Sequence, residues 1–184
     1  SALRLAEVRA TGAALILVGL GFKVAVVPFH MWTPDVYQGA PSAVTAFMSS
    51  GAKIAGFAAL LRVFATAFPA LAVDMTDIFW VMSAATMILG NVVAIAQTDI
   101  KRLLAYASIA HAGYLLLGVA ALNHAGQSAV LYYLSGYLFT TLAAFTVIAL
   151  VMRHLDNEDI SGLAGLNERS PLLAATMTLA MVSL

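Results

Sequence analysis

Residues 11–32 read TGAALILVGLGFKVAVVPFHMW, and this stretch decides the fold class. It is long enough and apolar enough to cross the hydrocarbon core of a bilayer, which is about 30 Å thick, as a helix. Because the apolar stretches are continuous, with no alternation of polar and apolar residues, we expect an all-α polytopic transmembrane helix bundle and not a β-barrel. Further spans are predicted at 42–65, 77–97, 102–122 and 127–152, and the start of a sixth at 171–184.

The composition agrees with a membrane protein, since 62% of the residues are hydrophobic and 10% are charged. An average soluble domain has about 25% charged residues. The net charge is zero, which suggests no nucleic acid or other polyanionic partner. The sequence contains no cysteine, so within it neither disulfides nor cysteine-ligated iron–sulfur clusters can form. We expect no cofactor and no metal in this chain, and we find no phosphate loop or catalytic nucleophile.

The chain is predicted to be one membrane domain, residues 1–184. Its one long connection, 153–170, holds too many charges for lipid and is expected to lie at the surface. These charges include Asp156, Glu158, Asp159, Glu168 and Arg169. We interpret the sequence as an internal piece of a longer polypeptide that folds poorly alone. At 99–102 we expect an acid at a helix N-terminus, followed by two interfacial cations, Lys101 and Arg102.

Two lysines fall near the middle of predicted spans. Lys53 lies about 16 Å into its span at 1.5 Å per residue, too deep to reach water easily. Ser49, Ser50 and Gly56 share its helical face and leave room for water or a neighbouring helix. A lysine at this depth is rare, and desolvation brings its charged and neutral forms closer in energy, as proton transfer requires.

Lys23 is predicted at similar depth, five residues before Pro28. Proline lacks an N–H, so we expect the helix to break there. Broken helices at membrane depth are typical of transport sites. The alternative for either lysine is a side chain that reaches the interface or binds a lipid headgroup.

His111 shares a helical face with Ser108 and Tyr114. A histidine titrates near neutral pH and suits a proton relay, although a neutral histidine bonded between helices fits the spacing equally well. In the next span Tyr133, Tyr137, Thr140 and Thr141 form a polar stripe. Such a stripe can support a chain of waters, but interhelical hydrogen bonding is its commoner use.

Four motifs resemble the antiporter-like membrane subunits of respiratory complex I. They are VPFHMWTPDVYQGAP at 27–41, SGAKIA at 50–55, TDIKRLLAYASIAH at 98–111 and GYLF at 136–139. The TPDVY form at 33–37 is most similar to the N-subunit group of bacterial NADH:quinone oxidoreductases, related to mitochondrial subunit two.

This resemblance implies a multi-pass protein of the bacterial inner (plasma) membrane with an antiporter-like fold. It implies that Lys23, Lys53 and His111 transfer protons, that Pro28 marks the helix break, and that Ser49, Ser50, Ser108, Tyr114 and Tyr137 support the polar path. The expected partners are other membrane subunits, lipids and protons. NADH, FMN, iron–sulfur clusters and quinone would belong to other subunits of the complex. A glutamate and a further lysine of the family's path fall outside this sequence.

Two alternatives remain open from the sequence. One is a subunit of a multisubunit sodium/proton antiporter, which shares the buried lysines but needs no electron donor. The other is a structural membrane subunit whose lysines only bind lipid or neighbouring chains.

Overall fold

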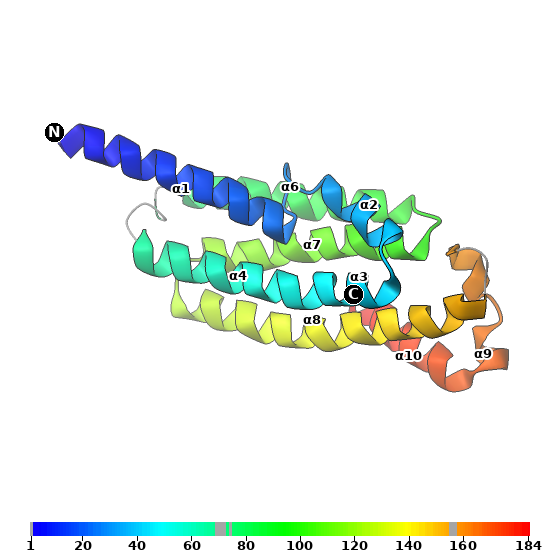
Figure 1. The fold of residues 1–184 in the computed structure, drawn as a ribbon. Helices are drawn as coiled ribbons and strands as arrows, with labels where there is room; N and C mark the ends of the chain where they lie inside the picture. The colour runs from blue at the N-terminus through cyan, green and yellow to red at the C-terminus, as the bar shows by residue number, and fades with distance from the viewer. Residues whose placement is uncertain (1, 69–72, 74, 155–157) are drawn as a thin grey trace.

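Long apolar helices run side by side and make up most of the molecule (Figure 1). The computed structural model describes residues 2–68, 73, 75–154 and 158–184. In these ranges extended pairing is limited to one isolated bridge between Asp99 and Asp159, so the fold is all-α. Five helices within the described residues are long and apolar enough to cross a membrane: Arg4–Val24, Ser42–Ala67, Thr76–Ile95, Ile100–Ala120 and His124–Val151.

The first helix occupies a different range from the predicted span 11–32. α1 (Ala2–Val24) begins earlier and also ends earlier, and the chain then turns before it enters α2 (Trp32–Gly39). Residues 25–31 are apolar enough to pass for helix, but Ala25 has a φ of 63°. A left-handed residue of this kind ends a helix. The first helix therefore stops before the end of its apolar run.

Neighbouring helices satisfy backbone groups at this interruption. The Trp32 indole donates to the carbonyl of Phe22 at 2.9 Å, and the N–H of Val27 donates to the hydroxyl of Thr86, on α6 (Thr76–Ile95), at 3.0 Å. Non-helical backbone inside a membrane protein needs such partners. Pro28 lies within the interruption, beyond the end of the helix.

The second span winds alternately as α-helix and π-helix. In order its segments are α3 (Ser42–Phe47), η1 (Met48–Ala52), α4 (Lys53–Arg62) and η2 (Val63–Ala67). A π-turn inserts an extra residue into a helix and is frequent at functional sites. η1 ends immediately before Lys53, and the side chains of Ser49, Ser50 and Lys53 are all buried.

α6 and α7 (Ile100–Ala120) pack so closely that two contacts require glycine. A Cβ at Gly90 would lie 2.6 Å from the backbone nitrogen of Ala110, and one at Gly113 would lie 2.7 Å from Cγ of Met87. α7 also contributes to both clusters of buried apolar side chains. One cluster surrounds Phe57 with α1 and α4, and the other joins α2, α8 (His124–Val151) and α10 (Pro171–Ser183). α8 also contributes to both clusters, so α7 and α8 together join the two halves of the bundle.

The connector after α8 returns to the start of α7. The N–H of Ile100 donates to the carbonyl of Glu158 at 3.0 Å, and the N–H of Ile160 donates to the carbonyl of Thr98 at 2.9 Å. The connector's elements are η3 (Met152–His154), η4 (Ile160–Leu163) and α9 (Leu166–Arg169). Asp156, one of the acids predicted for this connector, lies outside the described residues.

Candidate functional site

Lys53 lies near the middle of the second span, and only 3% of its surface is exposed. Its ammonium group donates to both the carbonyl and the hydroxyl of Ser108, on α7. The same nitrogen lies 5.8 Å from the ring centroid of Tyr137, on α8. All these partners are neutral, and among the residues that the structure describes Lys53 has no acidic partner. Its ammonium is therefore stabilised by dipoles and an aromatic face alone.

Ser108 joins Lys53 to two tyrosines. The side chains of Tyr37, from α2, and Tyr137 both lie beside the Ser108 side chain. Both tyrosines are buried. We call these four residues, Lys53, Ser108, Tyr37 and Tyr137, the Ser108 cluster. Because a hydroxyl can donate and accept at once, the cluster gathers groups of the kind that exchange protons.

Lys23 lies in the last turn of α1, and its side chain is exposed in the described structure. The sequence predicted it near the middle of a span, and the difference arises because α1 ends at Val24. A cavity of about 250 Å³ separates it from Lys53, which is room for several water molecules. The cavity is lined by Phe22, Lys23, Ala25, Trp32, Tyr37, Met48, Ala52 and Lys53.

Gly56 lets α4 approach the end of α1. A Cβ at this position would lie 2.6 Å from Cγ1 of Val24 and 3.5 Å from Cγ of Lys23. The room that the sequence predicted beside Lys53 is thus filled by a neighbouring helix, and this contact brings both lysines to the same cavity.

Ser49 and Ser50 are buried but bond within their own helix. Their hydroxyls donate to the carbonyl of Ala46 at 3.0 Å and 2.6 Å. The structure shows no hydrogen bond from either hydroxyl to Lys53 within the described ranges. Their place in a polar path therefore stays a prediction from the sequence.

His111 lies on the face of α7 that carries Ser108, with 4% of its surface exposed. Its Nδ1 hydrogen-bonds with the hydroxyl of Tyr133, and its Nε2 lies 2.7 Å from the carbonyl oxygen of Leu184. Its ring centroid is 5.1 Å from that of Tyr137. Tyr137 therefore lies between Lys53 and His111.

Tyr114, the other predicted neighbour of His111, is 40% exposed. The ring centroids of the two residues are 5.6 Å apart, and the Tyr114 hydroxyl accepts a hydrogen bond from the amide of Asn91 at 3.1 Å. A cavity of about 340 Å³ opens beside His111 and is lined mainly by α8 residues, Tyr133 and Tyr137 among them.

Sequence reasoning did not place Tyr37 in the site, and it paired Lys53 with serines of its own helix. Spacing along a helix shows which residues share a face but not which residue faces them from another helix. Tyr37 did fall within the motif at 27–41, and that motif was the one available signal for it.

Residues 5–184 match the sequence profile of a family described as NADH:quinone oxidoreductase/Mrp antiporter, transmembrane. The chain belongs to this family. Among members of the NADH:quinone oxidoreductase/Mrp antiporter family, NADH-quinone oxidoreductase subunit N of Trichlorobacter lovleyi is 51% identical over 174 residues, which cover 94% of this chain and 36% of that relative. Subunit N 1 of Herpetosiphon aurantiacus is 55% identical over 174 residues, covering 94% of this chain and 35% of the relative. The chain spans about a third of the length of these curated relatives.

Two solved structures share the fold of this chain. A chain of respiratory complex I from Thermus thermophilus matches with a TM-score of 0.80 and 42% identity, covering 94% of this chain and 37% of that one. A chain of the Mrp complex from Dietzia sp. matches with a TM-score of 0.87 and 29% identity, covering 93% of this chain and 32% of that one. The prediction of an antiporter-like bundle of transmembrane helices is confirmed.

Proposed function

We propose that this chain is part of a proton-translocating membrane subunit of an NADH:quinone oxidoreductase, of the subunit N type, in the bacterial inner membrane. Relatives named subunit N are 51% and 55% identical to it, and identity to the complex I chain, 42%, exceeds identity to the Mrp chain, 29%. Its partners would be other membrane subunits of the complex and the surrounding lipids.

The single observation that carries this proposal is the environment of Lys53. A lysine at mid-membrane is expensive to keep charged, and here its partners are a neutral carbonyl, a hydroxyl and an aromatic ring. Because none of the described residues sets a carboxylate against Lys53, its ammonium can lose its proton without leaving an unpaired anion among them. Lys53 is therefore suited to change its charge during a reaction cycle.

The arrangement around Lys53 supports a path in two directions. On one side, the cavity shared with Lys23 is large enough for water. On the other side, the ring of Tyr137 is near both the ammonium of Lys53 and the ring of His111. A proton gained by one lysine disfavours a proton on the other through Coulomb repulsion, which is strong where little water screens it. Loading and release can alternate in this way against a membrane potential, which costs about 2.3 kcal/mol per charge per 100 mV.

The chain would contribute to an enzyme complex without a redox active site of its own. Its sequence has no cysteine to ligate an iron–sulfur cluster. We assign NADH oxidation, FMN, the iron–sulfur clusters and quinone reduction to other subunits of the assembly, whose energy reaches this chain as a change of charge or conformation.

The test is Lys53→Met in the full-length protein, assembled in its complex in inside-out membrane vesicles. Methionine keeps most of the side-chain volume but cannot carry a proton. We expect normal assembly and a fall in protons pumped per NADH oxidised of about tenfold or more, since a proton-transfer group contributes at least that much. Lys53→Arg, which keeps a permanent charge, should fail as well. Normal pumping by assembled Lys53→Met would contradict the proposal and favour a structural subunit.

A sodium/proton antiporter subunit is the second candidate, favoured by the TM-score of 0.87 to the Mrp chain. It predicts sodium-dependent proton exchange in vesicles without NADH. Exchange of that kind, lost in Lys53→Met, would replace the first proposal with this one.

A further inference from the structure

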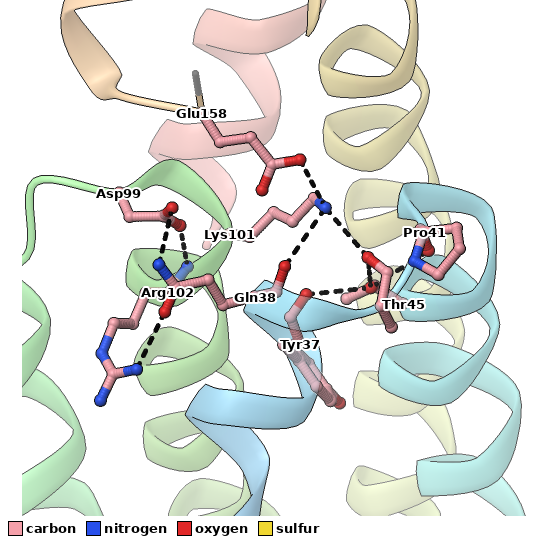
Figure 2. A network of polar contacts seen from close by, with 9 residues as sticks. Tyr37, Gln38, Pro41, Thr45, Asp99, Lys101, Arg102 and Glu158 are labelled. Atoms are coloured by element: carbon pink, nitrogen blue, oxygen red, sulfur yellow. Dashed lines mark hydrogen bonds and ion pairs between the residues drawn. The ribbon is translucent and has the colours of Figure 1, made fainter. Parts of the chain in front are cut away.

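A second buried lysine lies where α2, α7 and the connector meet. The ammonium of Lys101 pairs with the carboxylate of Glu158 at 2.6 Å, and the lysine side chain is 5% exposed (Figure 2). The sequence predicted Lys101 as a cation at the membrane interface, as it did Arg102. This prediction was wrong for Lys101, because α2 and the connector cover it.

Lys101 also holds the C-terminal end of α2. Its ammonium donates to the carbonyl of Ala40 at 2.9 Å, and the carbonyl of Gln38 lies 3.5 Å from it. The last carbonyls of a helix lack partners within that helix, and a cation beside them is favourable. From the following helix, the hydroxyl of Thr45 donates to the carbonyl of Tyr37 at 3.1 Å. The end of α2 is therefore fixed through its backbone.

The side chains at the start of α7 hold α2 from a second direction. The amide of Gln38 donates to Asp99 at 3.1 Å and accepts from Arg102 at 3.0 Å. Asp99 in turn accepts from the backbone N–H of Arg102 at 2.8 Å and caps α7. Figure 2 shows Asp99 and Arg102 beside Gln38, and Lys101 beside the turn between α2 and α3.

α2 connects this anchor to the Ser108 cluster. Tyr37 lies less than one helical turn before Ala40, whose carbonyl Lys101 holds. The Tyr37 side chain lines the same cavity as Lys53 and lies beside Ser108. Lys101 and Ser108 themselves lie two turns apart on the buried face of α7. The position of the Tyr37 hydroxyl relative to Lys53 therefore depends on how firmly Lys101 holds α2.

We propose that Lys101, oriented by Glu158, is a positioning residue that holds α2 so that the hydroxyl of Tyr37 stays at Ser108 beside Lys53. Lys101 itself carries no proton through the membrane in this scheme. Glu158 belongs to the connector that leads from α8 to α10, so the pair also ties that connector to the site. The inference rests on the proposed role of Lys53 in proton transfer.

The test compares four single variants and one double variant of the full-length protein in the assembled complex, again as protons pumped per NADH oxidised in inside-out vesicles. Lys101→Met removes both the pair with Glu158 and the hydrogen bond to Ala40, and we expect pumping to fall at least about fivefold. Lys101→Arg keeps a charged donor and should recover to within about twofold of the unmodified protein. Arg153→Met removes an exposed cation within the same connector and should leave pumping unchanged.

The fourth variant, Tyr37→Phe, tests the route of the effect. If Lys101 acts through Tyr37, then Lys101→Met combined with Tyr37→Phe should lose no more pumping than either change alone. If the double variant loses pumping by the product of the two single losses, the proposal is overturned. Normal pumping by Lys101→Met would also overturn it. If Lys101→Met does not assemble, Glu158→Gln takes its place in the same cycle with Tyr37→Phe, and normal pumping by Glu158→Gln would likewise overturn it.

Lys53→Met, measured in parallel, separates this inference from the proposed function. Normal pumping by Lys53→Met contradicts the proton-transfer role itself. Loss of pumping by Lys53→Met with normal pumping by Lys101→Met contradicts the positioning role alone.

Discussion

Lys53 and Lys101 are buried to the same extent, with 3% and 4% of their surfaces exposed. Their surroundings differ in charge. Lys101 lies at one end of α7 against a carboxylate and the carbonyls at the end of a helix. Lys53 lies at mid-span against Ser108 and the ring of Tyr137.

This difference separates a lysine that holds a helix in place from a lysine that can transfer a proton. A buried cation that pairs with a carboxylate is held by that partner, and removing either member of such a pair is costly. Lys101 can therefore serve as a clamp on α2. A buried cation with only neutral partners is poorly stabilised, and its neutral form leaves nothing unpaired. Burial alone thus does not mark a proton-transfer lysine, and the absence of a fixed counter-charge is the more useful sign.

The largest effect is expected from reversing the charge of the clamp with Lys101→Glu. The substitution sets a carboxylate against Glu158 and against the carbonyl of Ala40, and breaking a buried ion pair already costs about 3–5 kcal/mol. We expect the amount of assembled complex in the membrane, measured by native gel electrophoresis, to fall at least about tenfold.

Arg153→Glu is the matched control for that reversal, because Arg153 is exposed and lies in the same connector. It should assemble at the unmodified level. Equal losses from both variants would mean that charge on this side of the membrane, and not the clamp, governs assembly.

The second prediction gives Lys53 a carboxylate partner, as Lys101 has in Glu158. Ser108→Asp places a carboxylate where Ser108 now contacts the ammonium, and it gives Lys53 the counter-charge that it lacks among the described residues. We expect an assembled complex whose pumping per NADH falls about tenfold. Ser108→Asn, with the same shape but no charge, should pump several times better than Ser108→Asp. Equal pumping by the two variants would show that a fixed counter-charge does not matter at Lys53.

The third prediction concerns the approach of α4 to α1, which brings Lys53 to the shared cavity. In Gly56→Ala the new Cβ would lie 2.6 Å from Cγ1 of Val24, and Val24 is wholly buried, so it has nowhere to move. Overpacking of this kind lowers the free energy of unfolding by about 1–3 kcal/mol. The melting temperature of the purified complex should fall accordingly. Gly136→Ala is the control, since nothing lies within 4 Å of a Cβ there, and it should be neutral or slightly stabilising.

The sequence predicted the membrane helices well because span length and apolar composition are local properties. The second predicted span, 42–65, differs from the helix Ser42–Ala67 only at its end, and Lys53 lies near the middle of both. The first span was placed wrongly because residues 25–31 are as apolar as a helix, while the turn that ends α1 depends on backbone partners such as Thr86, which is far away in sequence.

The candidate site was predictable only as far as single helices allow. Spacing placed Ser108 and His111 on one face, and the structure agrees. It could not show that Ser108 meets Lys53, or that Glu158 from a distant connector covers Lys101, because such contacts arise when separate segments pack together. The sequence alone does not show whether a charged side chain near the start of a helix is exposed or buried.

The smallest effect is expected at Arg102, the neighbour of Lys101. Its guanidinium pairs with Asp35 at 2.6 Å, but the two side chains are 31% and 74% exposed. Exposed pairs contribute under about 1 kcal/mol, and the substitution Arg102→Gln leaves intact the backbone N–H that Asp99 caps. Melting temperature and pumping should both stay close to those of the unmodified complex, while Lys101→Met changes pumping several-fold. These adjacent cations both contact α2, so a loss from Arg102→Gln as large as that from Lys101→Met would show that charge, and not burial with a carboxylate, makes the clamp.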